Sequence, residues 1–246
     1  MADLPLVFVG AVFTLAGFVK GVIGLGLPTV SMGLLAIVVA PAQAAALLLV
    51  PSVATNIWQA FVGPALRRLA ARLWPMLAGV VVGTLLGTGW LTGPVARVGS
   101  GLLGVAIVIY ASLALAKVRF HVPPAREAIA GPLVGLATGL LAAATGVFVI
   151  PAVPYLQALD LDKDEMVQAL GLNFLVSTLA LAANLWLSGA MEGAFGWPML
   201  VALGAAFAGM AVGQAVRHRL SQALFRAGFL WSLLALGLYL AGRILV

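Results

Sequence analysis

The chain has 246 residues, of which 63% are hydrophobic and only 8% are charged, whereas soluble domains carry about 25% charged residues. This composition excludes a water-soluble globular fold, and the absence of cysteine excludes disulfide bonds and thiolate chemistry. The net charge of +6 comes from basic residues in short polar segments, as membrane orientation predicts, so we expect contact with a lipid bilayer and no nucleic-acid partner.

Apolar segments follow one another along the chain, and the longer ones have the roughly 20-residue length that crosses about 30 Å of hydrocarbon. A β-barrel would instead show alternating segments of about ten residues. Predicted helices lie at 4–24, 28–40, 42–62, 73–92 and 98–117, and after a basic break at 128–147, 151–159, 165–187, 196–216 and 223–244. The sequence therefore predicts an all-α polytopic membrane protein.

Two of these segments, 28–40 and 151–159, are too short to span a membrane alone. The first follows an interruption marked by Gly24, Gly26 and Pro28, and the second follows one that runs from Thr145 to Pro151. Such interruptions predict a broken helical hairpin in each half of the chain.

The two sets of five segments resemble each other in sequence. Asn56-Ile-Trp58 matches Asn184-Leu-Trp186, and Trp74-Pro75 matches Trp197-Pro198. Four glycines of the first half also match glycines of the second half in the same order: Gly17, Gly24, Gly83 and Gly87 match Gly139, Gly146, Gly209 and Gly213. Collinear matches predict two repeats of about five helical elements, 1–120 and 121–246, within one transmembrane domain.

Basic residues between the helices predict the orientation. They occur at 67–72, at 117–126 and at 217–226, and the positive-inside rule places all three groups in the cytoplasm. The connections expected there are 66–72, 118–127 and 217–222. Counting crossings outward makes both termini periplasmic and gives the two repeats opposite orientations, a recurrent design of secondary transporters.

The position of the charged residues limits what the protein binds. All seven carboxylates lie in loops or at helix ends, namely Asp3, Glu127, Asp160, Asp162, Asp164, Glu165 and Glu192. Lys20 lies instead inside the first hairpin, where a buried ammonium costs several kcal/mol and normally needs an anionic partner. Two interpretations remain open. Either a ligand anion lies beside Lys20, helped by the N-terminus of the helix that begins near Pro28, or the side chain extends to the lipid headgroups or to water.

Uncharged polar residues at the same depth add candidates for the site. Asn56 and Asn184 occupy matched positions and either line a binding site or join helices by hydrogen bonds. We expect the two hairpins to meet near mid-membrane and form one substrate-binding site. Its predicted lining residues are Lys20, Gly24, Gly26, Thr29, Asn56, Thr145 and Asn184. His121 and His218 are the only histidines, and both lie in basic segments, so we expect no metal site and no cofactor.

The segment GFVKGVIGLGLP at residues 17–28, within a first hairpin that has a duplicate, resembles the TauE/SafE family, also called sulfite exporter or TSUP proteins. The resemblance covers nearly the whole chain. It implies a permease of the bacterial cytoplasmic (inner) membrane for anionic sulfur compounds such as sulfite, sulfoacetate or other organosulfonates, acting as an exporter. The family carries a glycine-rich loop in both halves. Here the second, LAAATGVFVIP at residues 141–151, has alanines in several glycine places, and this departure bears on the substrate.

The expected function is therefore transport of a small anionic sulfur compound. Two alternatives remain open: a permease for another small organic anion, possibly proton-coupled, and a non-transporting membrane scaffold. A proton-coupled permease ordinarily needs an intramembrane carboxylate, and a scaffold does not need paired helix breaks. An enzyme is not expected, because the sequence lacks a Ser–His pair, a metal-ligand cluster and an Asp-rich magnesium motif. The sequence does not determine the oligomeric state.

Overall fold

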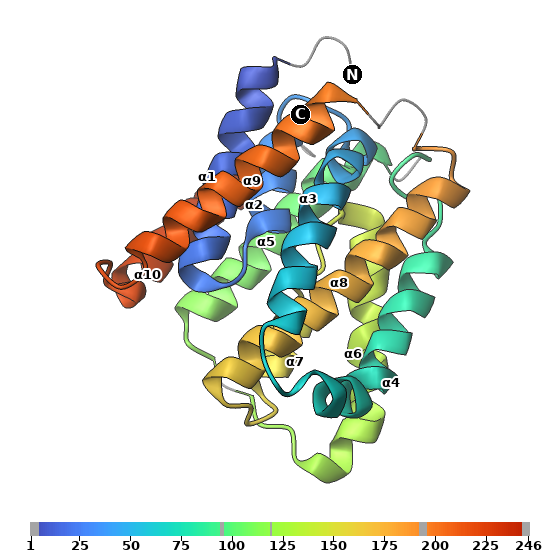
Figure 1. The fold of residues 1–246 in the computed structure, drawn as a ribbon. Coiled ribbons are helices and arrows are strands. Elements are labelled where there is room, and N and C mark those ends of the chain that lie inside the picture. Colours follow the sequence, from blue (N-terminus) through green and yellow to red (C-terminus); the bar gives the residue numbers. More distant parts are fainter. Residues whose placement is uncertain (1–4, 94–95, 119, 192–195, 243–246) are drawn as a thin grey trace.

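The computed structural model describes residues 5–93, 96–118, 120–191 and 196–242. These ranges fold into helices joined by short connections (Figure 1). Seven of the described helices are long and apolar enough to cross a membrane, which confirms the predicted all-α polytopic class. The helices are α1 (Leu6–Ile23), α2 (Leu27–Leu35), α3 (Pro41–Phe61), α4 (Leu66–Leu86), α5 (Ala96–Leu115), α6 (Pro124–Thr145), α7 (Ala152–Gln157), α8 (Lys163–Leu187), α9 (Trp197–Val216) and α10 (Gln222–Gly242).

Helices α2 and α7 are the short arms of the two hairpins. They have 9 and 6 residues, which at 1.5 Å per residue is about 14 Å and 9 Å, far less than the hydrocarbon thickness. The prediction that these segments do not span alone is therefore confirmed. Each follows a long helix after an interruption, so the chain reverses direction inside the protein.

The predicted bounds of α4 and its basic connection were wrong. The helix begins at Leu66 and ends at Leu86, so residues 66–72, expected to form a loop, are its first two turns. Hydropathy marks only the apolar part of a helix, whereas Arg67, Arg68 and Arg72 are good helix formers that extend it beyond that part. Likewise α6 begins at Pro124, so residues 124–127 of the expected loop at 118–127 are helical.

The helices pair across the two halves of the sequence through small residues. Helix α1 packs against α9, and α4 packs against α6. A Cβ atom added at Gly17 would clash with the backbone of Ala206 on α9, and one added at Gly139 would lie 2.5 Å from the backbone nitrogen of Thr84 on α4. Glycine at such positions lets helix backbones approach closely, as in small-xxx-small packing of membrane helices.

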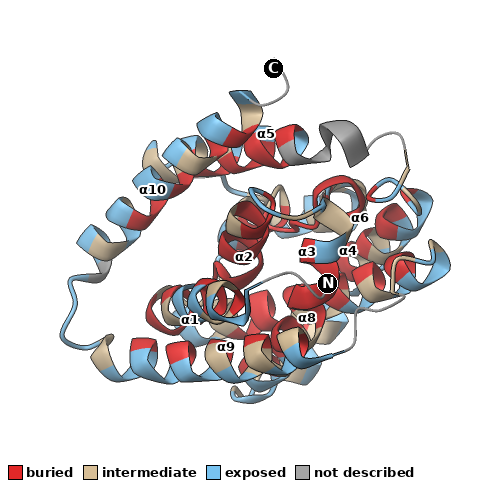
Figure 2. Cartoon of the chain, turned by 90° about the horizontal axis from the view of Figure 1, so that it is seen from above, coloured by how far each residue is buried: buried red, intermediate tan, exposed pale blue. Residues whose placement is uncertain are grey.

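Helices α3 and α8 form the centre of the molecule, between these two pairs. Helices α5 and α10 pack against each other at one side, and α2 lies between that pair and the centre (Figure 2). Eight of the nine residues of α2 are buried, all except Leu34. The short arm of the hairpin is thus enclosed by protein, and burial in protein is the condition under which non-helical backbone is tolerated inside a membrane.

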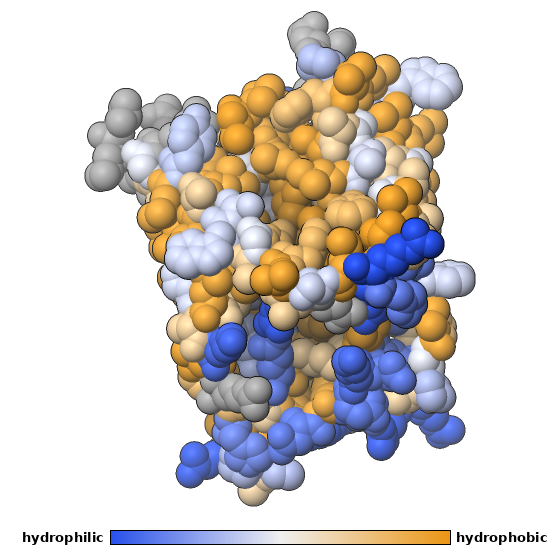
Figure 3. All heavy atoms as spheres, turned by 90° about the vertical axis from the view of Figure 1, so that its left-hand side faces the viewer, coloured by the Kyte–Doolittle hydropathy of each residue, from blue (hydrophilic) through white to orange (hydrophobic). Residues whose placement is uncertain are grey.

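Charged residues gather at one end of the molecule. Helix α1 begins and α10 ends at the upper end in Figure 1, whereas the α3–α4, α5–α6 and α7–α8 connections lie at the lower end. Hydrophilic side chains cluster over the lower half and apolar ones cover the upper part (Figure 3). Ion pairs join helix ends there: Arg72 of α4 contacts Glu127 of α6 at 2.6 Å, and Arg68 of α4 pairs with Glu165 of α8. Asp3, Arg119 and Glu192 lie outside the described residues.

Four of the exposed tryptophans lie toward the two ends of the molecule. Trp58 and Trp74 lie near the charged end, and Trp186 and Trp197 lie near the opposite end; each exposes more than half of its surface. Trp231 is equally exposed but lies midway along α10. Tryptophan is enriched where the bilayer meets water, so the first four agree with the apolar helices in placing the molecule across a membrane.

We expect Gly139→Leu to destabilise the protein by about 1–3 kcal/mol or more, because the added side chain enters the α4 backbone. Thermal unfolding of the purified protein in detergent measures this. Gly204→Leu on α9 is the matched control, since a Cβ there meets nothing within 4 Å. Equal unfolding temperatures for the two variants would contradict the packing described here.

Candidate functional site

The first hairpin break is built from two glycines in left-handed backbone conformation. Gly24, with φ of 79°, ends α1, and Gly26, with φ of 110°, precedes α2. Such φ values strain any residue with a Cβ. The side-chain amide of Gln59 on α3 donates to the carbonyl oxygen of Gly24 at 2.9 Å. The break is therefore fixed to α3.

Lys20 occupies the last turn of α1 and is 4% exposed. Its Nζ donates to Thr55 Oγ1 at 3.1 Å and to Asn56 Oδ1, both on α3. The prediction that the side chain extends to headgroups or water is thus wrong, because α3 captures the ammonium inside the protein. No carboxylate of the described residues forms an ion pair with it. A positive charge on Lys20 therefore has no balancing carboxylate among the described residues.

A chain of hydrogen bonds continues from Lys20 into the centre of the molecule. Asn56 Nδ2 donates to Ser52 Oγ at 3.1 Å, and Ser52 Oγ lies 3.0 Å from Thr178 Oγ1 on α8. The Thr178 hydroxyl donates to the carbonyl oxygen of Phe174 at 2.6 Å, so Ser52 is the donor to Thr178. Each group in this chain donates to the next one farther from Lys20. This order directs the Asn56 side-chain carbonyl oxygen toward the Lys20 Nζ.

The second hairpin break has a different construction. Gly146, with φ of 71°, ends α6. The Thr145 hydroxyl donates to the Leu141 carbonyl oxygen at 2.7 Å and accepts the Val147 N–H at 3.2 Å. Thr145 therefore satisfies the backbone of its own break, and its oxygen is not directed to the Lys20 network.

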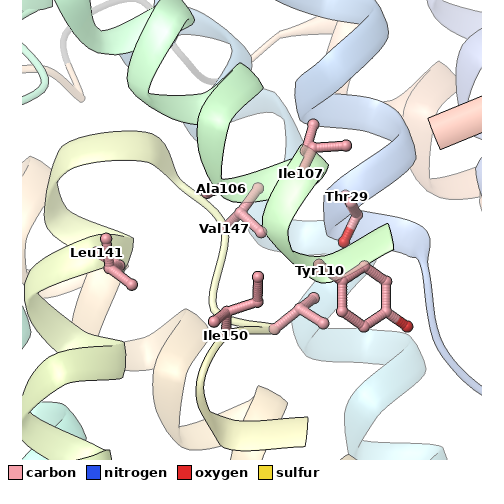
Figure 4. Close-up of a pocket in the computed structure, with 8 residues that line it drawn as sticks. Thr29, Ala106, Ile107, Tyr110, Leu141, Val147 and Ile150 are labelled. Atoms are coloured by element: carbon pink, nitrogen blue, oxygen red, sulfur yellow. The ribbon is translucent and has the colours of Figure 1, made fainter. Parts of the chain in front are cut away.

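The two hairpins touch each other, as predicted. Met32 of α2 packs on the second break, where a Cβ added at Gly146 would lie 2.6 Å from the Met32 terminal carbon. A small cavity beside this contact has about 10 Å³ open to the centre of a water molecule, which is room for roughly one water. Residues of α2, α5, α6 and the second break line it, as Figure 4 shows: Thr29, Ala106, Ile107, Tyr110, Leu141, Val147, Val149 and Ile150.

Thr29 supplies the polar group of this cavity. The residue is 1% exposed, and its Oγ1 has no hydrogen-bond partner among the described residues. A buried hydroxyl without a partner costs about 1–3 kcal/mol. Thr29 is therefore ready to bind a small polar ligand or water at the place where the hairpins meet.

Asn184 lies apart from the Lys20 network. Its Nδ2 donates to the Thr84 carbonyl oxygen at 2.6 Å, whereas its Oδ1 is buried without a partner among the described residues. Asn173 and Ser177 lie on the same face of α8. Their side chains also have buried polar atoms without a hydrogen-bond partner among the described residues. The structure thus brings Lys20 and Asn56 together, and does not bring Asn184 into direct contact with them.

Sequence reasoning missed Ser52 and Thr55 as members of the Lys20 network. Both are fully buried on α3. Their spacing from Asn56, four residues and one, places all three on the side of α3 that faces α1 and α8. The helical spacing of Ser52, Thr55 and Asn56, just after Pro51, could have predicted a shared polar face on α3. Within the described residues no three His, Asp or Glu side chains gather to hold a metal ion.

Comparison with known proteins identifies the family. The family model described as "Sulfite exporter TauE/SafE" matches residues 9–240, nearly the whole chain. The chain therefore belongs to the TauE/SafE family of membrane transporters, and the predicted resemblance is confirmed. No curated protein and no solved structure matches it significantly.

The contact between Asn56 and Lys20 predicts coupled effects on stability. Asn56→Leu removes an acceptor from a buried charge and is expected to cost about 1.5–3 kcal/mol. In a Lys20→Met background the same change should cost much less, because the charge is gone. Thermal unfolding of both single variants and the double variant measures this coupling.

Asn184→Leu is the matched control for this cycle, because its amide binds Thr84 and not Lys20. Its effect should add to that of Lys20→Met. Additive effects of Asn56→Leu and Lys20→Met would show that the hydrogen bond does not form.

Proposed function

We propose that this member of the TauE/SafE family transports small anionic sulfur compounds, such as sulfite or organosulfonates, and that Lys20 is the positive charge that receives them. One observation carries the proposal: Lys20 is buried, and its described partners, Thr55 and Asn56, are neutral.

The energetics favour an anion as ligand. The hydrogen bonds that Lys20 donates to Thr55 and Asn56 solvate the ammonium but supply no opposite charge. A buried cation without an opposite charge is costly, and its attraction to an anion increases where water is excluded. A cationic substrate would meet repulsion at the same point. The proposed binding site therefore discriminates substrates first by the sign of their charge.

The proposed site extends from Lys20 toward the contact between the hairpins. Gly24 and Gly26 shape the break beside Lys20, and the N-terminus of α2 directs its dipole into that break. Thr29 offers its hydroxyl to the ligand, and Asn56 orients the ammonium. Thr145 and Asn184 belong to the second half of the proposed site, where Asn184 Oδ1 offers an acceptor to water or to a protonated substrate oxygen.

We also propose that residues 1–120 and 121–246 are inverted repeats. The helix pairing supports this proposal. In the proposed repeat α6 corresponds to α1 and α9 corresponds to α4, and accordingly α1 packs against α9 and α6 packs against α4. Helix α1 begins at the upper end in Figure 1 and α6 begins at the lower end. One match from the sequence does not support the repeat, because Trp74-Pro75 lies inside α4 whereas Trp197-Pro198 begins α9.

The proposed direction of transport is outward across a bacterial cytoplasmic membrane, with the charged end in the cytoplasm. Each unit of negative charge that leaves a negative interior gains about 2.3 kcal/mol per 100 mV, or about a fiftyfold concentration ratio. The described carboxylates lie in connections or helix ends, and none is buried, so the proposal needs no coupling ion.

Flux into proteoliposomes tests the proposed function. With sulfite, thiosulfate, sulfoacetate and a carboxylate control, an imposed potential at equal pH should drive uptake of the sulfur anions. Lys20→Met should lower this flux at least about tenfold, since a hydrogen bond to a charged group contributes about 1.5–3 kcal/mol, while the protein stays folded. Lys20→Arg should retain part of the flux.

Asn56→Asp is the matched test of charge in a side chain of the same size; it also replaces the amide donor to Ser52 by an acceptor. It places a carboxylate against the Lys20 ammonium without changing side-chain size, and should also abolish anion flux while leaving the thermal stability equal or higher. Undiminished flux in Lys20→Met, or flux that follows a pH gradient and ignores the potential, would overturn the proposal.

Reporter fusions test the orientation. Alkaline phosphatase fused after Val246 should be active, because the proposed C-terminus is periplasmic. The same enzyme inserted beside His121 should be inactive, because the α5–α6 connection is proposed to be cytoplasmic. The reverse pattern would invert the membrane placement and the direction of transport.

A further inference from the structure

We propose that a cleft at the charged end is the entrance through which the anion reaches the hairpin contact, and that the ring of Tyr110 is the gate that closes this entrance in the present conformation. The inference rests on the proposed anion transport. It adds to it a binding surface, a gate and a defined conformational state.

The cleft is large and open. Its volume is about 740 Å³, and it lies between α5, α7, α10 and the α5–α6 connection. Three of its lining residues, Lys117, His121 and Arg226, are basic, and one, Asp160, is acidic. His121 Nδ1 lies 3.3 Å from Asp160 Oδ2.

Lys117 and Arg226 carry the attraction for an anion. Both are exposed, and neither forms an ion pair with a described carboxylate. A concave surface lined by one sign of charge focuses the field and concentrates ions of opposite sign. A small oxyanion therefore collects in this cleft in preference to a cation.

Tyr110 is the residue that the cleft and the small cavity share. It lines both, and it is 5% exposed. In Figure 4 its ring lies near Thr29, and its hydroxyl is directed away from Ile150. The aromatic ring thus separates about 740 Å³ of open space from the cavity that Thr29 lines.

The size of the small cavity that Thr29 lines shows that the present conformation is closed to an anion. Its 10 Å³ hold roughly one water, whereas sulfite has four heavy atoms and organosulfonates have more. An anion can occupy this place only if the cavity enlarges. Because Tyr110 forms the wall toward the cleft, displacement of its ring both enlarges the cavity and joins it to the entrance. The present conformation is closed at this point and open below it.

Cysteine accessibility tests the gate directly, because the chain contains no cysteine and each introduced thiol is the only one. Ala114 lines the cleft and Ala106 lines the inner cavity. The full-length protein in detergent is treated with 2-sulfonatoethyl methanethiosulfonate, an anionic reagent that is itself an organosulfonate. Ala114→Cys should be modified rapidly and Ala106→Cys should be protected.

Shortening the gate should reverse the protection. Ala106→Cys is expected to become reactive in a Tyr110→Ala or Tyr110→Leu background and to stay protected with Tyr110→Phe, which keeps the ring. Tyr239→Ala is the matched control, because Tyr239 lies exposed on α10, outside both spaces. Protection that persists in the shortened variants, checked to be folded by thermal unfolding, would overturn the gate.

The effect of the cleft's positive charge is measured separately, from the rates of cysteine modification by anionic and cationic reagents. Arg226→Gln should slow modification of Ala114→Cys by the anionic reagent severalfold and leave modification by a cationic thiosulfonate unchanged or faster. Equal effects on both reagents would overturn the anion-collecting role. These labelling rates do not depend on flux, so their failure is distinguishable from failure of the Lys20 experiment.

Discussion

Every feature of this protein depends on one constraint: a helix interrupted inside a membrane must have its free backbone groups satisfied by protein. The chain interrupts a helix twice, after Ile23 and after Thr145. Gln59 satisfies the first break and Thr145 the second. Thr145 acts within its own segment, whereas Gln59 reaches Gly24 from the neighbouring helix α3. Glycines on α1, α4, α6 and α9 let the surrounding helices pack closely. The same packing keeps water away from Lys20, which would strengthen its attraction for the proposed anion.

The two breaks are unequal in chemistry. The spacing that matches Gly17 and Gly24 to Gly139 and Gly146 puts Ala142 at the place of Lys20, so the second half offers no ammonium there. It offers instead the Asn184 carbonyl, the Asn173 amide and the Ser177 hydroxyl, all buried and without partners among the described residues. One half supplies charge and the other supplies neutral polar groups. A site built in this way suits an anion that must bind and leave, since two buried cations would hold it too strongly.

Much of this arrangement could be predicted from the sequence, because membrane helices are marked by apolar length and their breaks by glycine and proline. The segments 28–40 and 151–159 were recognised as too short to span, and they form α2 and α7. The start of α4 could not be predicted from hydropathy, because Arg67, Arg68 and Arg72 continue the helix after the apolar signal ends. The hydrogen-bond partners of Lys20 could not be predicted either. They depend on the position of α1 relative to α3, and the residue pattern within one helix does not encode its contact with another helix.

The hydrogen bonds also determine which parts of the molecule can move. Gln168 Nε2 donates to the carbonyl oxygens of Ala60 and Gly63, both at 2.7 Å, and its Oε1 accepts the Ala65 N–H at 3.0 Å. Gln59 joins Val167 to Gly24 in the same region. These bonds lock α3, α8 and the first break into one body.

The hydrogen bonds of the described side chains do not join α5 or α10 to that body; the pair meets α2 through apolar side chains, such as Ile107 and Leu236 beside Gly33. Apolar contacts slide at lower cost than buried polar networks break. Motion of the α5–α10 pair over the centre would therefore break none of these hydrogen bonds. Tyr110, on α5, lies where such motion opens or closes the way to Thr29.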